Sequence, residues 1–132
     1  MILAIKTDQP QAELKLLEAA SGGIVDEISW QAHRELSDTI LTNIDRLLKN
    51  NNHALNDVTA LIVFEGPGSF TGLRIGISVA NTLSYALDVP VVGAGTPDWV
   101  RVGTKLLQNQ KGFSEVAAPQ YGAPAHITTP RK

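Results

Sequence analysis

The first thirty residues carry the pattern of short strands. Residues 2–5 form a continuous apolar run, which is typical of a strand buried on both faces. Apolar and polar residues alternate over residues 11–16 and predict a half-buried strand. Turn residues follow at positions 21–23, and the extended pattern resumes over residues 24–31. Three strands joined by short turns predict an antiparallel meander.

A helical period replaces the strand pattern further along the chain. Over residues 35–50 apolar side chains recur three or four positions apart, which predicts an amphipathic helix ended by three asparagines. Residues 61–64 indicate a buried central strand, residues 71–87 a second helix, and residues 90–93 a short strand.

A third helix is expected to start at Thr96-Pro97-Asp98, with threonine as N-cap and proline at the first helical position. Its predicted apolar side consists of Trp99, Val102 and Leu106. The resulting order βββαβαβα predicts an α/β fold with a mixed five-stranded sheet. Crossovers through helices would place residues 2–5 and 61–64 side by side in that sheet.

Regular patterning ends near residue 112. Prolines and glycines interrupt every later segment, so no long helix or strand fits there. We therefore divide the chain into one lobe, residues 1–111, and a proline-rich C-terminal tail, residues 112–132, which is either disordered or draped on the lobe.

The amino-acid composition of the chain limits the functions that it can have. The chain has 132 residues, 43% of them apolar, which is enough for one domain with a core. A net charge of −2 without a basic cluster argues against RNA binding by this chain alone. The absence of cysteine excludes disulfides and thiolate metal sites. The first apolar run is too short for a signal peptide or a membrane span, so a cytoplasmic protein is expected.

The most specific motif is the strand–turn–helix segment EGPGSFTGLRIG, residues 65–76. Two glycines flank a proline, which predicts a tight turn, and the following helix N-terminus could hold an anion. Gly66, Gly68 and Ser69 are therefore candidate phosphate-binding residues. The alternative is a purely structural turn, and no lysine follows as in a Walker motif.

The second helix is apolar on nearly every side and carries a stripe of small residues four positions apart. Interior glycines weaken a helix, so we expect a compensating close contact. One interpretation is a partner surface; the alternative is that the glycines face the sheet. The predicted interface, from the first two helices, comprises Gly72, Leu73, Arg74, Gly76, Ile77, Ala80, Leu83, Ser84, Ile40 and Ile44. On this hypothesis Gly76→Leu would disrupt pairing and leave the lobe folded.

The string GPGSFTGLRIG, the chain start at residues 1–5 and residues 33–36 resemble the bacterial TsaB (YeaZ) family. The resemblance implies a single RNase H-like lobe of the actin/Hsp70 (ASKHA) type. It also implies a non-catalytic partner of the TsaD enzyme in making threonylcarbamoyladenosine in tRNA, with the ATPase TsaE as a further partner. On this view tRNA is met only through the complex, the isolated chain forms a homodimer, and the second lobe of family members is expected to be missing.

Two rival functions stay open. The first is an ATP-binding phosphotransferase or ATPase of the ASKHA type; the family resemblance places an aspartate where this chain has Lys6, which reverses the charge offered to hydrated magnesium. The second is a diverged structural homodimer. His33, His53 and His126 are scattered and predict no metal site, and no catalytic residue or cofactor is expected.

Overall fold

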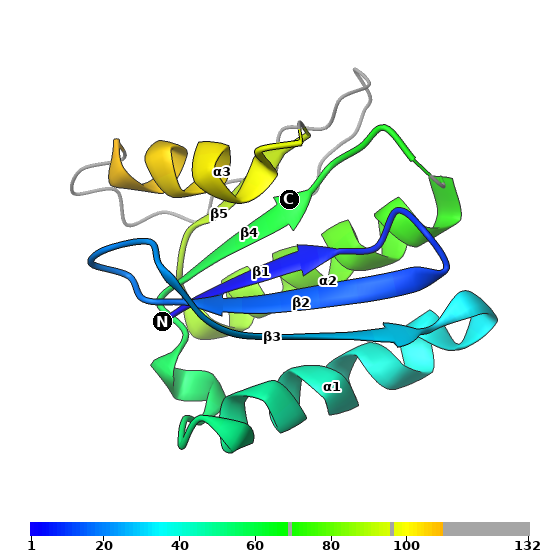
Figure 1. Ribbon diagram of the computed structural model, residues 1–132, viewed down its shortest axis with the longest axis horizontal. Helices are drawn as coiled ribbons and strands as arrows, with labels where there is room; N and C mark the ends of the chain where they lie inside the picture. The colour runs from blue at the N-terminus through cyan, green and yellow to red at the C-terminus, as the bar shows by residue number, and fades with distance from the viewer. Residues whose placement is uncertain (69, 96, 110–132) are drawn as a thin grey trace.

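The computed structural model describes residues 1–68, 70–95 and 97–109 (Figure 1). Five strands form one sheet in the order β3-β2-β1-β4-β5. The strands are β1 (Ile2–Lys6), β2 (Gln11–Leu17), β3 (Ile24–Gln31), β4 (Ala60–Phe64) and β5 (Val91–Ala94). The helices are α1 (Leu36–Asn50), α2 (Phe70–Leu87) and α3 (Trp99–Gln108), with short 3₁₀ turns η1 (His33–Glu35) and η2 (Leu55–Asp57). The predicted order βββαβαβα and the α/β class are confirmed.

The sheet joins an antiparallel half to a parallel half. Strands β1, β2 and β3 form the predicted meander, with Leu14 of β2 opposite both Ile5 and Ile28. Strands β1, β4 and β5 run parallel, and Ile5 is paired with Val63. The continuous apolar runs therefore occupy the centre of the sheet, as parallel strands covered on both faces require. Strands β3 and β5 are the two edge strands of the sheet.

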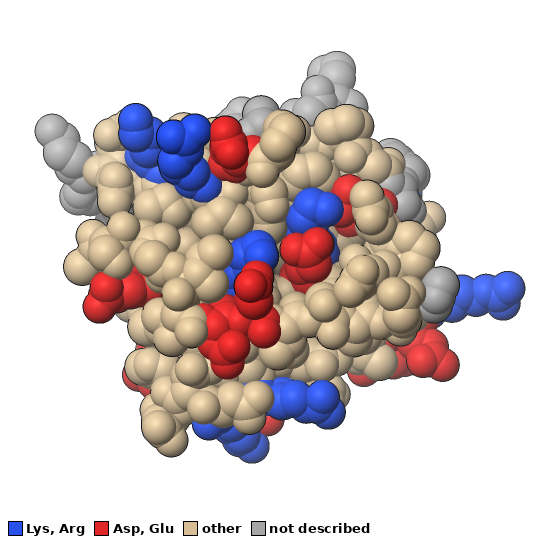
Figure 2. Space-filling view, in the orientation of Figure 1, with Lys and Arg blue, Asp and Glu red and all other residues tan. Residues whose placement is uncertain are grey.

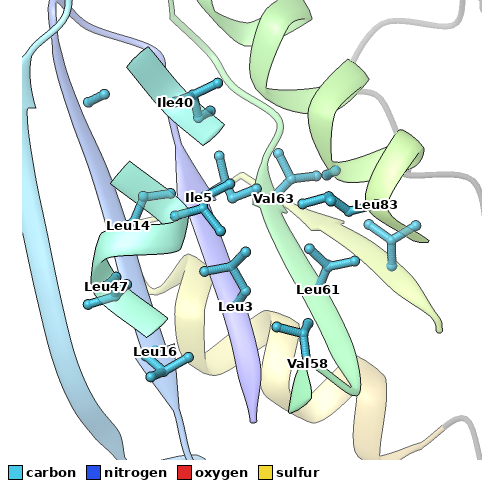
Figure 3. Close-up of a cluster of buried hydrophobic side chains, with 14 of the residues drawn as sticks. Leu3, Ile5, Leu14, Leu16, Ile40, Leu47, Val58, Leu61, Val63 and Leu83 are labelled. Atoms are coloured by element: carbon cyan, nitrogen blue, oxygen red, sulfur yellow. The ribbon is translucent and has the colours of Figure 1, made fainter. Parts of the chain in front are cut away.

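Helices cover both faces of the sheet (Figure 1). Helices α1 and α2 lie on one face and α3 lies on the other, so each face has its own hydrophobic cluster. Figure 3 shows the larger cluster, in which side chains of β1, β2 and β4 meet those of α1 and α2. Alternation along β1 divides its side chains between the clusters: Leu3 and Ile5 point to α1 and α2, and Ile2 and Ala4 point to α3.

The third helix differs from the sequence-based prediction. It begins at Trp99, so Pro97 precedes the helix, and Asp98 makes no side-chain cap bond; Thr96 lies outside the described residues. Trp99 is buried edge-to-face against Phe64, with ring centroids 5.9 Å apart. Leu106, however, is 39% exposed, and Leu107 packs on the cluster instead. Trp99 and Val102 pack on the smaller cluster as predicted, and only the third predicted position was wrong, by one residue, because both candidates are leucines.

Close approach of α3 to the sheet depends on Gly103. A Cβ at this position would lie 2.5 Å from Cγ2 of Ile62, a buried side chain of β4. We predict that Gly103→Ala destabilises the fold by about 1–3 kcal/mol through overpacking, although alanine favours the helix by about 1 kcal/mol. Urea unfolding measures this change. Lys105→Ala, an exposed change in the same helix, is the control, and equal stability of the two variants would contradict the packing argument.

Candidate functional site

Helix α2 is seated on the end of β1 by one buried threonine. Thr7 is 1% exposed, and its Oγ1 donates a hydrogen bond to the carbonyl oxygen of Gly72, 2.7 Å away. A Cβ on Gly76 would lie 2.3 Å from the same Oγ1. The small residues of α2 therefore let the helix approach the sheet, which is the structural alternative for this stripe.

This packing corrects the list of predicted interface residues. Most of them are buried in the chain's own core and are not available to a partner in this structure: Leu73, Gly76, Ile77, Ala80, Leu83, Ser84, Ile40 and Ile44. Gly72 is half-buried, and Arg74 is exposed and makes a contact within the chain. The helix is apolar on several sides because it packs on strands, on α1 and on the turn before it.

A different set of side chains lines the outer surface of the two helices. Tyr85 of α2 is 81% exposed and Leu41 of α1 is 56% exposed. Ile75 and Val79 of α2 are half-buried on the edge of the larger cluster. Sequence reasoning missed Tyr85 and Leu41; their signal was that each falls off the apolar stripe that its own helix turns to the sheet.

Charged residues gather where β1 and β4 end. Lys6 Nζ lies 2.6 Å from Oδ1 of Asp8, and Asp8 is only 8% exposed. The same ammonium lies 4.8 Å from the ring centroid of Phe64, at cation–π distance. Lys6 and Asp8 thus neutralise each other at the sheet edge where the ASKHA resemblance places an acidic nucleotide-site residue.

Glu65 is a second acidic residue at this end of the sheet, and the hydrogen bonding of its carboxylate is incomplete. Its Oε1 is buried, and no described residue gives it a hydrogen bond. Loss of solvent around this side chain raises the pKa of Glu65. The side chain is confined because Gly95 approaches closely: a Cβ there would lie 2.4 Å from the Gly66 carbonyl oxygen and 3.4 Å from Cγ of Glu65.

The glycine turn is packed against acid, which does not favour a phosphate. Gly66 has a φ of +118°, a conformation that L side chains rarely adopt. Gly68 lies so close to Asp8 that a Cβ would come within 3.2 Å of Oδ2 of that carboxylate. The nearby ammonium of Lys6 is engaged by this carboxylate, so it is not free to bind a phosphate at the turn. Ser69 lies outside the described residues, so phosphate binding by the full turn stays a prediction.

The histidines do not converge in the described part of the chain. His53 Nδ1 lies 3.2 Å from Oδ2 of Asp57, and the backbone N–H of Ala54 donates to the same oxygen. These two contacts, the backbone bond first, lower the pKa of Asp57. The side chain of His33 and all of His126 lie outside the described residues. Within residues 1–68, 70–95 and 97–109 no three acids or histidines are placed to hold a metal.

An open groove of about 750 Å³ lies between the β2–β3 turn and α3. Its lining mixes Glu13 and Asp98 with Lys15, Arg101 and Lys105. Lys15 contacts both Glu13 and Glu27, and Arg101 contacts Asp98. Figure 2 likewise shows basic and acidic side chains interspersed on this face of the molecule. None of the described helices is long and apolar enough to cross a bilayer.

The sheet order, the helices on its two faces and the glycine turn ahead of α2 define an RNase H-like lobe of the ASKHA class. The family model described as "TsaD: tRNA N6-adenosine threonylcarbamoyltransferase" matches residues 9–112. Within that group the relatives and structural neighbours identify the branch: the chain belongs to the TsaB/YeaZ family.

Individual relatives support this assignment over part of their length. The chain is 35% identical over 91 residues to the tRNA threonylcarbamoyladenosine biosynthesis protein TsaB of Haemophilus influenzae, covering 69% of this chain and 37% of that protein. A tRNA N6-adenosine threonylcarbamoyltransferase of Geotalea uraniireducens is 40% identical over 77 residues, covering 58% and 22%. The structure of YeaZ from Pseudomonas aeruginosa has a TM-score of 0.64 at 31% identity, covering 71% and 43%. The chain thus spans between 22% and 43% of the length of these relatives.

Gly76→Leu is now expected to unfold the lobe, contrary to the sequence-based hypothesis. The new side chain collides with Thr7 and breaks its bond to Gly72, so we predict a loss of about 2–4 kcal/mol. Chemical denaturation of the isolated chain measures it. Ser78→Leu places the same side chain on the exposed side of α2 and serves as control. Unchanged stability of Gly76→Leu would show that the glycine stripe does not face the sheet.

Glu65→Gln is expected to stabilise the isolated chain at neutral pH. Because the folded-state pKa of Glu65 is raised, the folded chain binds its proton more tightly than the unfolded chain. Stability of the wild type should therefore fall as pH rises through the window above 4.5, the ordinary value, and the variant should lack this loss. Denaturation at pH 4 and pH 7 checks the prediction; a variant less stable at pH 7 would refute it.

Proposed function

We propose that this lobe is a non-catalytic pairing module in the biosynthesis of threonylcarbamoyladenosine in tRNA, and that its partner is a TsaD-type enzyme. The observation that carries the proposal is the exposed apolar surface of α1 and α2 in a chain of the TsaB/YeaZ family. Curated relatives in Haemophilus influenzae and Escherichia coli are named for this pathway.

The physical case for pairing starts with Tyr85 and Leu41. A large aromatic and a leucine project from two helices that lie side by side on one face of the sheet (Figure 1). Tyrosine combines a large apolar surface with few rotatable bonds, which makes it frequent at the centre of interfaces. Ile75 and Val79 of α2 are further apolar side chains that the chain's own core covers only in part. Burial of these four side chains against partner helices would remove them from water.

In the proposed mechanism the chain does no chemistry of its own. Partner helices pack along α1 and α2 and are thereby held in an active arrangement. The same surface can pair with a second copy about a two-fold axis, so a homodimer of the isolated chain competes with the heteromeric complex. A TsaE-type ATPase and tRNA would join through the TsaD-type partner.

The rival ATP-binding function has one observation in its favour and one against it. The glycine turn and Asp8 lie together at the end of the parallel strands, where α/β folds bind ligands. Against it, Lys6 already forms an ion pair with Asp8, so the carboxylate is neutralised where a magnesium ion would need it. Calorimetry with ATP and magnesium distinguishes the two functions, since a pairing module binds neither.

Replacement of the exposed apolar side chains tests the pairing proposal. We predict that Tyr85→Ala and Leu41→Ala each weaken binding to a purified TsaD-type protein by about tenfold or more, as truncation of a central interface side chain does. Val25→Ala is the matched control, because Val25 is an apolar residue of β3 that is 49% exposed on another part of the surface. Binding is measured by titration calorimetry, and tRNA modification is assayed with and without the chain. Equal affinities for all three variants would place the interface elsewhere.

A further inference from the structure

The buried carboxylate oxygen of Glu65 has a desolvation cost that no described residue offsets with a hydrogen bond. One of its oxygens is buried without a hydrogen-bond donor from any described residue. Removing an ionised carboxylate from water without a partner is unfavourable, and native structures rarely leave such a group uncompensated without a functional reason. Burial also raises the pKa of this group, as expected when solvent is lost and nothing replaces it.

The neighbouring charges do not supply the missing partner. Lys6 is the cation on the adjacent strand, and its ammonium is engaged by Asp8 and by the ring of Phe64. Lys6 and Asp8 neutralise each other, so this ion pair leaves the charge of Glu65 uncompensated. No ion pair joins Glu65 to a lysine, arginine or histidine within the described ranges.

The position of Glu65 connects it to the surface proposed for pairing. The turn that follows it abuts the first turn of α2, since a Cβ on Gly66 would lie 3.1 Å from Cδ1 of Leu73. Thr71 and Arg74, on that first turn, and Pro67 in the turn itself are exposed. Glu65 as a whole is half-buried rather than buried, so part of the residue remains at the surface next to the buried Oε1.

We propose that Glu65 is the acceptor for a basic side chain, a lysine ammonium or an arginine guanidinium, carried by the protein that packs along α2. The inference rests on the proposed pairing function and adds a charged contact at the N-terminal end of the helix. A cation is favoured over a metal ion because a single carboxylate oxygen suffices for an ammonium or guanidinium, whereas magnesium and calcium need several oxygen ligands. The partner's charge would offset the desolvation that the isolated chain tolerates.

The test is titration of the purified TsaD-type protein with the wild-type chain, Glu65→Gln and the control Glu18→Gln. Glu18 is an exposed acid at the end of β2, so its neutralisation controls for the loss of one negative charge. We expect Glu65→Gln to bind roughly tenfold more weakly or worse, as loss of a charged hydrogen bond does. We also expect a shallower dependence of its affinity on salt than that of the wild type, while Glu18→Gln behaves as wild type. Thermal unfolding confirms that both variants are folded.

The outcomes separate this inference from the function on which it rests. If Tyr85→Ala weakens binding and Glu65→Gln does not, the pairing surface stands and the role of Glu65 is overturned. If Glu18→Gln loses as much affinity as Glu65→Gln, the effect is one of net charge and the specific contact is overturned. If the wild-type chain does not bind the TsaD-type protein at all, the proposed function fails, and this inference fails with it.

Discussion

The seating of α2 on the end of β1 is the constraint on which the rest of the structure depends. Thr7 can donate to the Gly72 carbonyl only because Gly76 carries no side chain at the point of contact. That hydrogen bond and the glycine beside it hold the helix close to the end of β1. With Gly72 and Gly76 turned to the sheet, the same side of α2 fills the core, and the opposite side, Tyr85 above all, remains outside. A helix with a larger residue at position 76 would lie further from the sheet and present another surface.

Periodicity was sufficient to predict the architecture but not the orientation of the longest helix. Strands and helices separated well in the sequence because the alternating segment 11–16 and the apolar runs 2–5 and 61–64 differ in pattern from the period of α1. Helix α2 is apolar on several sides, so its sequence did not say which side faces the sheet, and glycine spacing fits a close approach to strands or to another helix equally well. The hydrogen bond that shows which side of α2 faces the sheet comes from Thr7, which is 65 residues from Gly72 in the chain.

At the charged end of the sheet, too, the sequence predicted one feature and could not predict another. The sequence showed that Lys6 departs from the family pattern, and the structure shows what replaces that pattern: an ion pair with Asp8 beneath an aromatic ring. No sequence pattern could show that Glu65 lacks a hydrogen-bond donor among the described residues, because that property depends on the packing of Gly95 and Gly66 around it. Groups whose cost exceeds their contribution within one chain are the ones that point to a second molecule.

The outermost position of β3 has a consequence for how this lobe behaves in concentrated solution. The strand has eight residues and pairs only with β2 among the described strands, so the peptide groups along its other side offer a template for sheet extension. Exposed Ile24 and Val25 would add to that tendency. Asp26, which accepts a hydrogen bond from Asn51, and Glu27, which pairs with Lys15, follow them directly, and charged side chains on an edge strand oppose its pairing with another copy. These two acids therefore oppose the aggregation that the adjacent apolar pair would otherwise favour.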